Sequence, residues 1–231
     1  LPPVSLAVSF KTPTPLNTNS ATDSGDDAKP IVVTDKIGHW VSVWQSDDTL
    51  GDTVGTDFDI LVSRSSNNGT TWSAPEALNT NAASDLGDDR EPALTTDGAG
   101  NWVCVWQSTS ALGATDTTDT DLFVSVSTDY GVTWSAVEAL NTTYETDGAV
   151  VDTSPTIATD KAGVWVCAWE SDNTLGGTIG SDLDILVSRS TDNGQTWGAP
   201  APAKDTADAD GAVIDEKACI GCQLCVVACH D

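Results

Sequence analysis

The chain has 231 residues, a length that suits one all-β domain or two small domains and allows a buried core. Its 35 acidic residues outnumber its 9 lysines and arginines, so the formal net charge is −26. This charge argues against binding to nucleic acid or to an anionic membrane, because phosphate groups would be repelled, and no apolar run reaches the ~18 residues of a membrane span.

One sequence unit occurs three times along the chain. WVSVW at 40–44 recurs as WVCVW at 102–106 and as WVCAW at 165–169, 62 and then 63 residues later. All 9 tryptophans fall into three sets of three. Such self-similarity is the signature of a repeat architecture. The same spacing separates Pro30, Pro92 and Pro155, and also Trp72, Trp134 and Trp197.

Each unit is predicted to form four short strands. The first strand follows the proline, as in PIVVTD at 30–35, and the second is the WVxVW stretch. Alternation in the second strand puts both tryptophans on one face, with Ser42, Cys104 or Cys167 between them. The fourth strand begins at TW and continues through sequences such as WSAPEAL. The third strand is DILVSRS at 59–65, with copies at 121–127 and 184–190.

Turn-rich loops join these strands, and no stretch has helical periodicity. Four antiparallel strands repeated at a fixed spacing make a β-propeller blade. The sequence therefore predicts an all-β fold with three four-stranded blades, at 28–80, 90–142 and 153–203. DGAVVD at 147–152 returns as DGAVID at 210–215, so the start of a fourth blade is expected as well. Because propellers close with about four to eight blades, we expect a longer parent chain or a second copy to complete the ring.

The same turn motif lies between the third and fourth strands of every unit. It reads SSNNGTTW at 65–72, STDYGVTW at 127–134 and STDNGQTW at 190–197. These segments resemble the Asp-box of the sialidase-like, or BNR-repeat, β-propellers, and the resemblance extends over residues 15–215.

The box is expected to be structural rather than catalytic. Its Asp or Asn accepts hydrogen bonds from the turn backbone, its Gly adopts a positive φ, and its Trp anchors the hairpin in the core. These residues are Asn67, Gly69 and Trp72 in the first unit, Asp129, Gly131 and Trp134 in the second, and Asp192, Gly194 and Trp197 in the third.

The resemblance also implies what a sialidase active site would contain: three arginines on the substrate carboxylate, a Tyr–Glu nucleophile pair and an Asp acid/base. Arg64 and Arg189 are repeat copies of one position and should not converge. Arg90 is the single ligand-binding candidate, although it could instead balance the acids of its own loop. Tyr144 and Glu145 are adjacent and are not expected to form the nucleophile pair. We therefore predict no catalytic residue, and the alternative is a fragment of a sialidase-type glycoside hydrolase.

Closely spaced aspartates recur in the loops between the second and third strands. Clustered carboxylate oxygens on loops are the ligands that calcium prefers, so these pairs are candidate calcium sites. The alternative is that they cap turns and keep the surface hydrated, and no loop has the EF-hand spacing. The pairs are Asp57 and Asp59, Asp119 and Asp121, and Asp182 and Asp184. The loops into the first strands add Asp23, Asp26, Asp27, Asp85, Asp88, Asp89, Asp147 and Asp152.

Residues 216–231 form a Cys-rich tail that is separate from the repeats at 1–215. The tail resembles the cluster-binding segment of bacterial-type [4Fe–4S] ferredoxins, but the second half of such a ferredoxin is missing. A zinc site, a variant of haem attachment, and a truncation or junction are the alternatives. The four candidate ligands are Cys219, Cys222, Cys225 and Cys229.

These observations lead to the expectation of a secreted, non-catalytic propeller that acts as a scaffold or binding module, outside the cell or on its surface. Carbohydrate is the ligand class that the resemblance implies, although all nine tryptophans are expected to lie in blade cores. Electron transfer through an iron–sulfur cluster in the tail is a further alternative. Because the chain begins at Leu1 rather than at Met, we also expect that a leader or upstream sequence has been removed.

Overall fold

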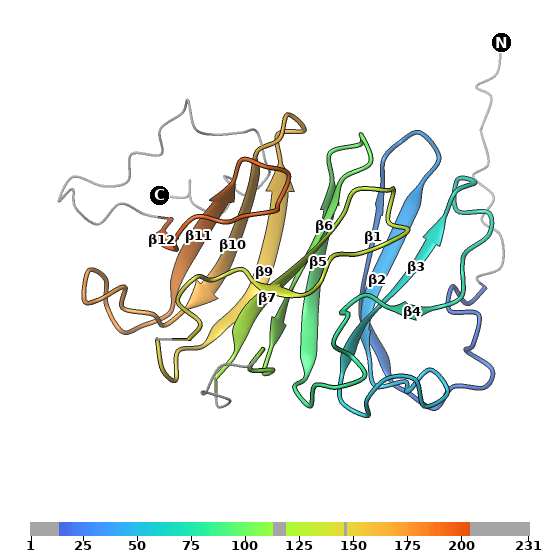
Figure 1. Ribbon diagram of the computed structural model, residues 1–231, viewed down its shortest axis with the longest axis horizontal. Coiled ribbons are helices and arrows are strands. Elements are labelled where there is room, and N and C mark those ends of the chain that lie inside the picture. Colours follow the sequence, from blue (N-terminus) through green and yellow to red (C-terminus); the bar gives the residue numbers. More distant parts are fainter. Residues whose placement is uncertain (1–13, 113–118, 146, 204–231) are drawn as a thin grey trace, which may run out of the picture.

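Three antiparallel sheets make up the structure, a computed structural model that describes residues 14–112, 119–145 and 147–203 (Figure 1). Each sheet has four strands that pair in sequence order, and no described residue is helical, which confirms the predicted all-β fold. Blade 1 contains β1 (Asp27–Thr34), β2 (Trp40–Ser46), β3 (Asp59–Ser65) and β4 (Glu76–Ala77). Blade 2 contains β5 (Asp89–Thr96), β6 (Trp102–Ser108), β7 (Asp121–Ser127) and β8 (Glu138–Ala139). Blade 3 contains β9 (Asp152–Thr159), β10 (Trp165–Ser171), β11 (Asp184–Ser190) and β12 (Ala201–Pro202).

The blades stand side by side, and the first strands of neighbouring blades are in contact: β1 with β5, and β5 with β9. Every sheet has two distinct ends. The β2–β3 loop and its copies lie at the lower end in Figure 1, which we call the acidic end, and the Asp-boxes lie at the upper, box end. Among the described residues there is no helix with the length and apolar character of a membrane span.

The first strand of each blade begins before its proline, which corrects the prediction that it would follow the proline. β1 starts at Asp27, three residues ahead of Pro30, and β5 and β9 start in the same way. The pairing register shifts between Ala28 and Ile31, so the proline sits in a β-bulge where its missing N–H breaks no ladder bond. The bulge N–H of Glu91 instead donates to Gln45 Oε1 of the preceding blade at 3.0 Å. The bulge therefore also ties one blade to the next.

The fourth strands contain only two residues each, so the prediction of a strand starting at TW was too long. A serine side chain explains the difference in the first two blades. Ser73 Oγ accepts a hydrogen bond from the Arg64 N–H at 3.1 Å, and Ser135 Oγ accepts one from Val126 N–H at 3.1 Å. The serine hydroxyl takes the place of a backbone carbonyl as the acceptor. Regular backbone pairing of the third and fourth strands begins only at Glu76 and Glu138.

Two apolar cores lie between the blades rather than within them. In each core, a valine-bearing face of one blade packs against the tryptophan-bearing face of the next. The predicted shared face of the two tryptophans and the residue between them is confirmed. The first core joins Val41, Val43, Ile60 and Val62 of blade 1 to Trp102, Cys104 and Trp106 of blade 2. The second joins Val103, Val105, Leu122 and Val124 to Trp165, Cys167 and Trp169 of blade 3.

Candidate functional site

The Asp-boxes are hydrogen-bonded turns, as predicted. Asp129 Oδ1 accepts from the backbone N–H groups of Val132 at 3.0 Å and Thr133 at 2.8 Å. The box glycines have φ values of +73°, +78° and +80°. Hydrogen bonds from the Thr196 hydroxyl and backbone lower the pKa of Asp192 to about 2, so this carboxylate is held by the turn. The box carboxylates therefore stabilise the turns in which they lie.

The box tryptophans differ from the expectation that every tryptophan lies in a blade core. Trp72, Trp134 and Trp197 are only half-buried, whereas the tryptophans of β6 and β10 are fully buried. Trp134 packs against the first core with part of its ring, and Trp197 packs against the second core. The rest of each ring remains open to solvent.

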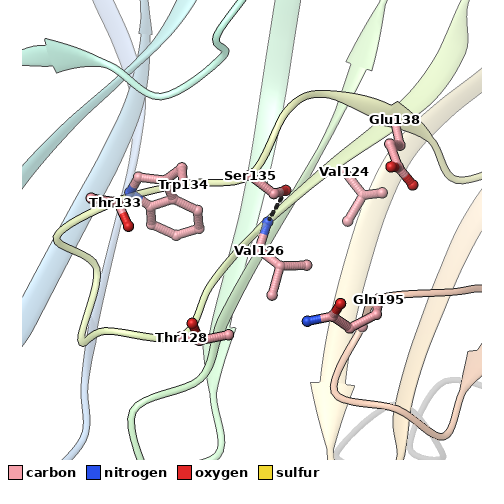
Figure 2. Close-up of a pocket in the computed structure, with 9 residues that line it drawn as sticks. Val124, Val126, Thr128, Thr133, Trp134, Ser135, Glu138 and Gln195 are labelled. Carbon is pink, nitrogen blue, oxygen red and sulfur yellow. Dashed lines mark hydrogen bonds between the residues drawn. The ribbon is translucent and has the colours of Figure 1, made fainter.

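A groove of about 280 Å³ lies between blades 2 and 3, beside the second box, and we call it the rim groove (Figure 2). In Figure 2 the Trp134 ring lies on one side of Val126, and the Gln195 side chain lies on the other. Glu138 of β8 stands farther along the same wall, and both Glu138 and Gln195 are exposed. An aromatic ring, a carboxylate, a carboxamide and hydroxyls are a suitable lining for a ligand that carries hydroxyl groups. The full lining is Val124, Val126, Thr128, Thr133, Trp134, Ser135, Glu138, Gly194 and Gln195.

Sequence reasoning did not single out Glu138 and Gln195. A smaller groove of about 150 Å³ occupies the same place between blades 1 and 2, with Glu76 in the position of Glu138. In that groove Val132 replaces Gln195 and Arg64 replaces Val126. The recurring glutamate was therefore a signal in the sequence that could have pointed to the groove. Gln195 gave no such signal, because it occupies a variable box position and reaches the groove from the neighbouring blade.

The arginines do not gather in one place. Arg64 and Arg189 lie at the box end, on β3 and β11 of different blades. Arg90 lies at the opposite, acidic end, where its Nη2 is 3.0 Å from Asp88 Oδ2 and its guanidinium stacks 3.7 Å from the centre of the Phe58 ring. Arg90 thus already has an acidic partner and an aromatic partner.

Tyr144 and Glu145, the adjacent residues that are not expected to form a nucleophile pair, are hydrogen-bonded to each other. Tyr144 Oη donates to Glu145 Oε1 at 3.0 Å. Partial burial and the neighbouring Glu145 raise the pKa of the Tyr144 phenol, which makes the oxygen harder to deprotonate. The pair lies in the β8–β9 loop, near Asp121 at the acidic end, and not beside Arg64 or Arg189.

Two groups of three aspartates lie at the acidic end, one at each joint between blades. In each group, one carboxylate oxygen per residue lies within 4.8 Å of the others. One member comes from the β2–β3 loop or its copy, the second is the first residue of the strand that follows, and the third comes from the segment that leads into the next blade. We call them the first joint triad, Asp57, Asp59 and Asp85, and the second joint triad, Asp119, Asp121 and Asp147.

The middle aspartate of each triad is buried and held by an asparagine. Asn79 Nδ2 donates to Asp59 at 2.7 Å and to Asp89 at 2.8 Å, and Asn141 bridges Asp121 and Asp152 in the same way. Burial, with a smaller contribution from neighbouring acids, raises the pKa of Asp59 to about 7, and it has the same effect on Asp121.

The other candidate ligands are not assembled into a group. Asp182 is exposed and Asp184 is half-buried, and they join no described group of three acids. The tail cysteines at 219–229 lie outside the described residues, so the iron–sulfur interpretation stays a prediction. Cys104 and Cys167 are fully buried, and burial raises the pKa of both thiols, which disfavours the thiolate that binds metals.

Comparison with known proteins places these features in a family. Residues 17–215 match the BNR repeat-like domain. A Hadza microbial sialidase is similar in structure, with 20% identity and a TM-score of 0.53 over 76% of this chain and 37% of that chain. A leech intramolecular trans-sialidase matches with 10% identity and a TM-score of 0.48, over 85% and 54% of the two chains. A Penicillium chrysogenum α-L-arabinanase matches with 18% identity and a TM-score of 0.45, over 70% and 45%.

The chain spans between 37% and 54% of the length of these three structures, and no curated protein matches it. The likeness to the microbial sialidase supports the propeller fold. Since the match to the repeat extends over most of its length, the chain belongs to the BNR repeat-like domain family.

Proposed function

We propose that this chain is a non-catalytic β-propeller scaffold that binds carbohydrate in the rim groove, outside the cell or on its surface. The observation that carries the proposal is the lining of the groove, where the half-buried Trp134 ring lies near polar side chains from two blades. A sugar offers an apolar C–H face to such a ring and hydroxyl groups to Glu138 and Gln195.

The placement of the arginines supports a binding role over hydrolysis. A carboxylate clamp needs guanidinium groups that converge on one ligand. Arg64 and Arg189 lie on separate blades at the box end, and Arg90 is paired with Asp88 at the other end. The Tyr144 phenol, whose pKa is raised, is a poor nucleophile for the alternative sialidase reaction.

Titration with arabinobiose and 3′-sialyllactose, followed by ligand-observed NMR, tests the proposal. We expect at least one sugar to bind, and Gln195→Ala or Glu138→Ala to weaken that binding about fivefold, because each removes a hydrogen bond of about 1 kcal/mol. Glu76→Ala is the matched control, since it makes the same change in the smaller groove between blades 1 and 2.

Each part of the proposal has its own contrary outcome. Equal loss of binding in Glu76→Ala and Glu138→Ala would remove the rim groove as the site. Binding of neither sugar would contradict carbohydrate recognition in the form proposed. Release of the dye from a fluorogenic sialoside by the purified chain would show that it is an enzyme.

We also propose that a second copy of the chain packs against the outer faces of blades 1 and 3, where Val32 and Ile185 are exposed. Blade 1 presents a tryptophan-bearing face and blade 3 a valine-bearing face, and these are the two halves of the joint that already occurs twice within the chain. Ile185 on blade 3 is 49% exposed, whereas its repeat copies Ile60 and Leu122 are fully buried. Val32 on blade 1 is 54% exposed, and its copy Leu94 is 6% exposed. Head-to-tail pairing of two copies would bury both ends.

A further inference from the structure

The first joint triad gathers buried acids whose charges and oxygen atoms are not all paired within the described part of the chain. Three carboxylates at a triad repel one another, and Asp59 and Asp121 are 1% and 5% exposed. Among the described residues, no ion pair neutralises a member of the first triad, because the pairs Lys29–Glu91, His39–Asp35 and Arg90–Asp88 lie elsewhere.

Buried oxygen atoms of the first joint triad lack hydrogen-bond donors. Asp59 Oδ1 accepts from Asn79, but Asp59 Oδ2 is buried and has no hydrogen-bond partner within the described part of the chain. Asp57 Oδ2 and Asp85 Oδ1 are in the same condition. Oδ1 of Asn81 is also buried without a hydrogen-bond partner, while the Asn81 amide group donates to Asp85 Oδ2 at 2.6 Å. Buried polar atoms without partners are rare in folded proteins, and a bound cation would give these oxygen atoms a partner.

The geometry of the triads points to one particular kind of ion. Calcium binds six to eight oxygen ligands at about 2.3–2.6 Å, so two oxygens on one ion lie at most about 5 Å apart. In each triad, one carboxylate oxygen per residue falls within this span. Magnesium demands a tighter octahedron at about 2.0–2.1 Å, and zinc prefers nitrogen and sulfur ligands in its structural sites.

We propose that each joint triad binds one calcium ion, with water completing the coordination, and that this ion fastens neighbouring blades together. The first ion would link Asp57 of the β2–β3 loop and Asp59 at the start of β3, both in blade 1, to Asp85, from the segment that leads into blade 2. The second would link blade 2 to blade 3 through Asp119, Asp121 and Asp147. Thr143 replaces Asn81 beside the second triad, and its hydroxyl donates to Asp147 at 2.8 Å.

Calcium titration by isothermal calorimetry tests the proposal on the full chain after removal of metals with EDTA. We expect Asp59→Asn and Asp121→Asn each to lose one equivalent of bound calcium relative to the unchanged chain. Asp52→Asn is the matched control, because it removes one charge from an exposed position in the loop that contains Asp57. Equal calcium binding by all four proteins would mean that the general acidity of the surface holds the ions, and it would overturn the proposal.

Thermal unfolding separates a metal site from a merely structural carboxylate. In EDTA, Asp59→Asn should unfold at the same temperature as the unchanged chain or above it, because it relieves repulsion among buried acids. In millimolar calcium the order should reverse, since only the unchanged chain gains the full binding free energy. A melting temperature of the unchanged chain that does not respond to calcium would also overturn the proposal. Neither experiment uses a sugar, so its result is independent of carbohydrate binding.

Discussion

The box position that varies between the units shows how one residue can replace another in this turn. Asn67 Oδ1 accepts from the Thr71 N–H at 2.9 Å, and Asp192 Oδ1 accepts from the Thr196 N–H at 3.0 Å. The Asn67 amide donates to the Thr71 hydroxyl at 2.8 Å, whereas Asp192 accepts from the Thr196 hydroxyl at 2.6 Å. The threonine hydroxyl reverses its role, so the turn closes with either side chain.

This exchange predicts a pH-dependent effect of Asp192→Asn. The pKa of Asp192 falls from 3.8 to about 2, so its carboxylate stabilises the fold above pH ~4, and this contribution is lost as the pH falls through about 2. Because the residue is exposed, we expect Asp192→Asn to cost under about 1 kcal/mol at neutral pH and still less near pH ~2. Urea unfolding of both proteins at the two pH values measures the difference. A cost that grows in acid would contradict this account.

At the scale of elements, the boxes also set the spacing between blades. A Cβ atom added to Gly131 would lie 2.6 Å from Val41 Cγ2 of the preceding blade, and one added to Gly194 would lie 2.6 Å from Val103 Cγ2. A Cβ atom on Gly69, in the first box, would meet nothing closer than 3.9 Å. In the second and third boxes, glycine is therefore needed for two reasons: its positive φ and the close packing of the blades.

Gly69→Ala and Gly131→Ala form a matched pair that separates these two requirements. Both positions have a positive φ, so each substitution should cost about 1–2 kcal/mol for the backbone conformation alone. Gly131→Ala should cost a further ~1–3 kcal/mol, because it overpacks the joint at Val41. Denaturant midpoints of the two variants provide the comparison. Equal losses of stability would show that the box does not limit the approach of the blades.

The repeated strands and the boxes could be predicted from the sequence because their signals are local. Alternation in WVxVW sets which residues share a face, and the box spacing sets the turn bonds. The short β4 could not be predicted, because the Ser73 hydroxyl competes with the ladder only once the hairpin has formed. The joint triads were visible as acids in separate loops, but the selection of Asp85 as the partner of Asp57 and Asp59 depends on how two blades meet. Gln195 reaches the rim groove across such a joint as well.

At the scale of the whole molecule, the exposed apolar residues Val32 and Ile185 on the two outer blade faces predict self-association of the purified chain. Ile185→Lys places a charge on the valine-bearing face of blade 3 and should shift the chain toward the monomer, because a lysine cannot be buried cheaply in that joint. Ile37→Lys is the control, since Ile37 is 68% exposed in the β1–β2 turn and lies on neither face. Size-exclusion chromatography with light scattering gives the masses. A monomer at all concentrations for the unchanged chain would contradict pairing of two copies.

The packing of each valine-bearing face on the next tryptophan-bearing face makes the stability of the molecule a sum over neighbouring pairs of blades. Opening a joint at either end breaks one such pair, while releasing blade 2 breaks both. The rim groove draws Trp134 from blade 2 and Gln195 from blade 3, so a ligand held there contributes its binding free energy to the second joint and not to the first. Ligands that bind in the grooves of such a propeller can thus stabilise its joints separately, one pair of blades at a time.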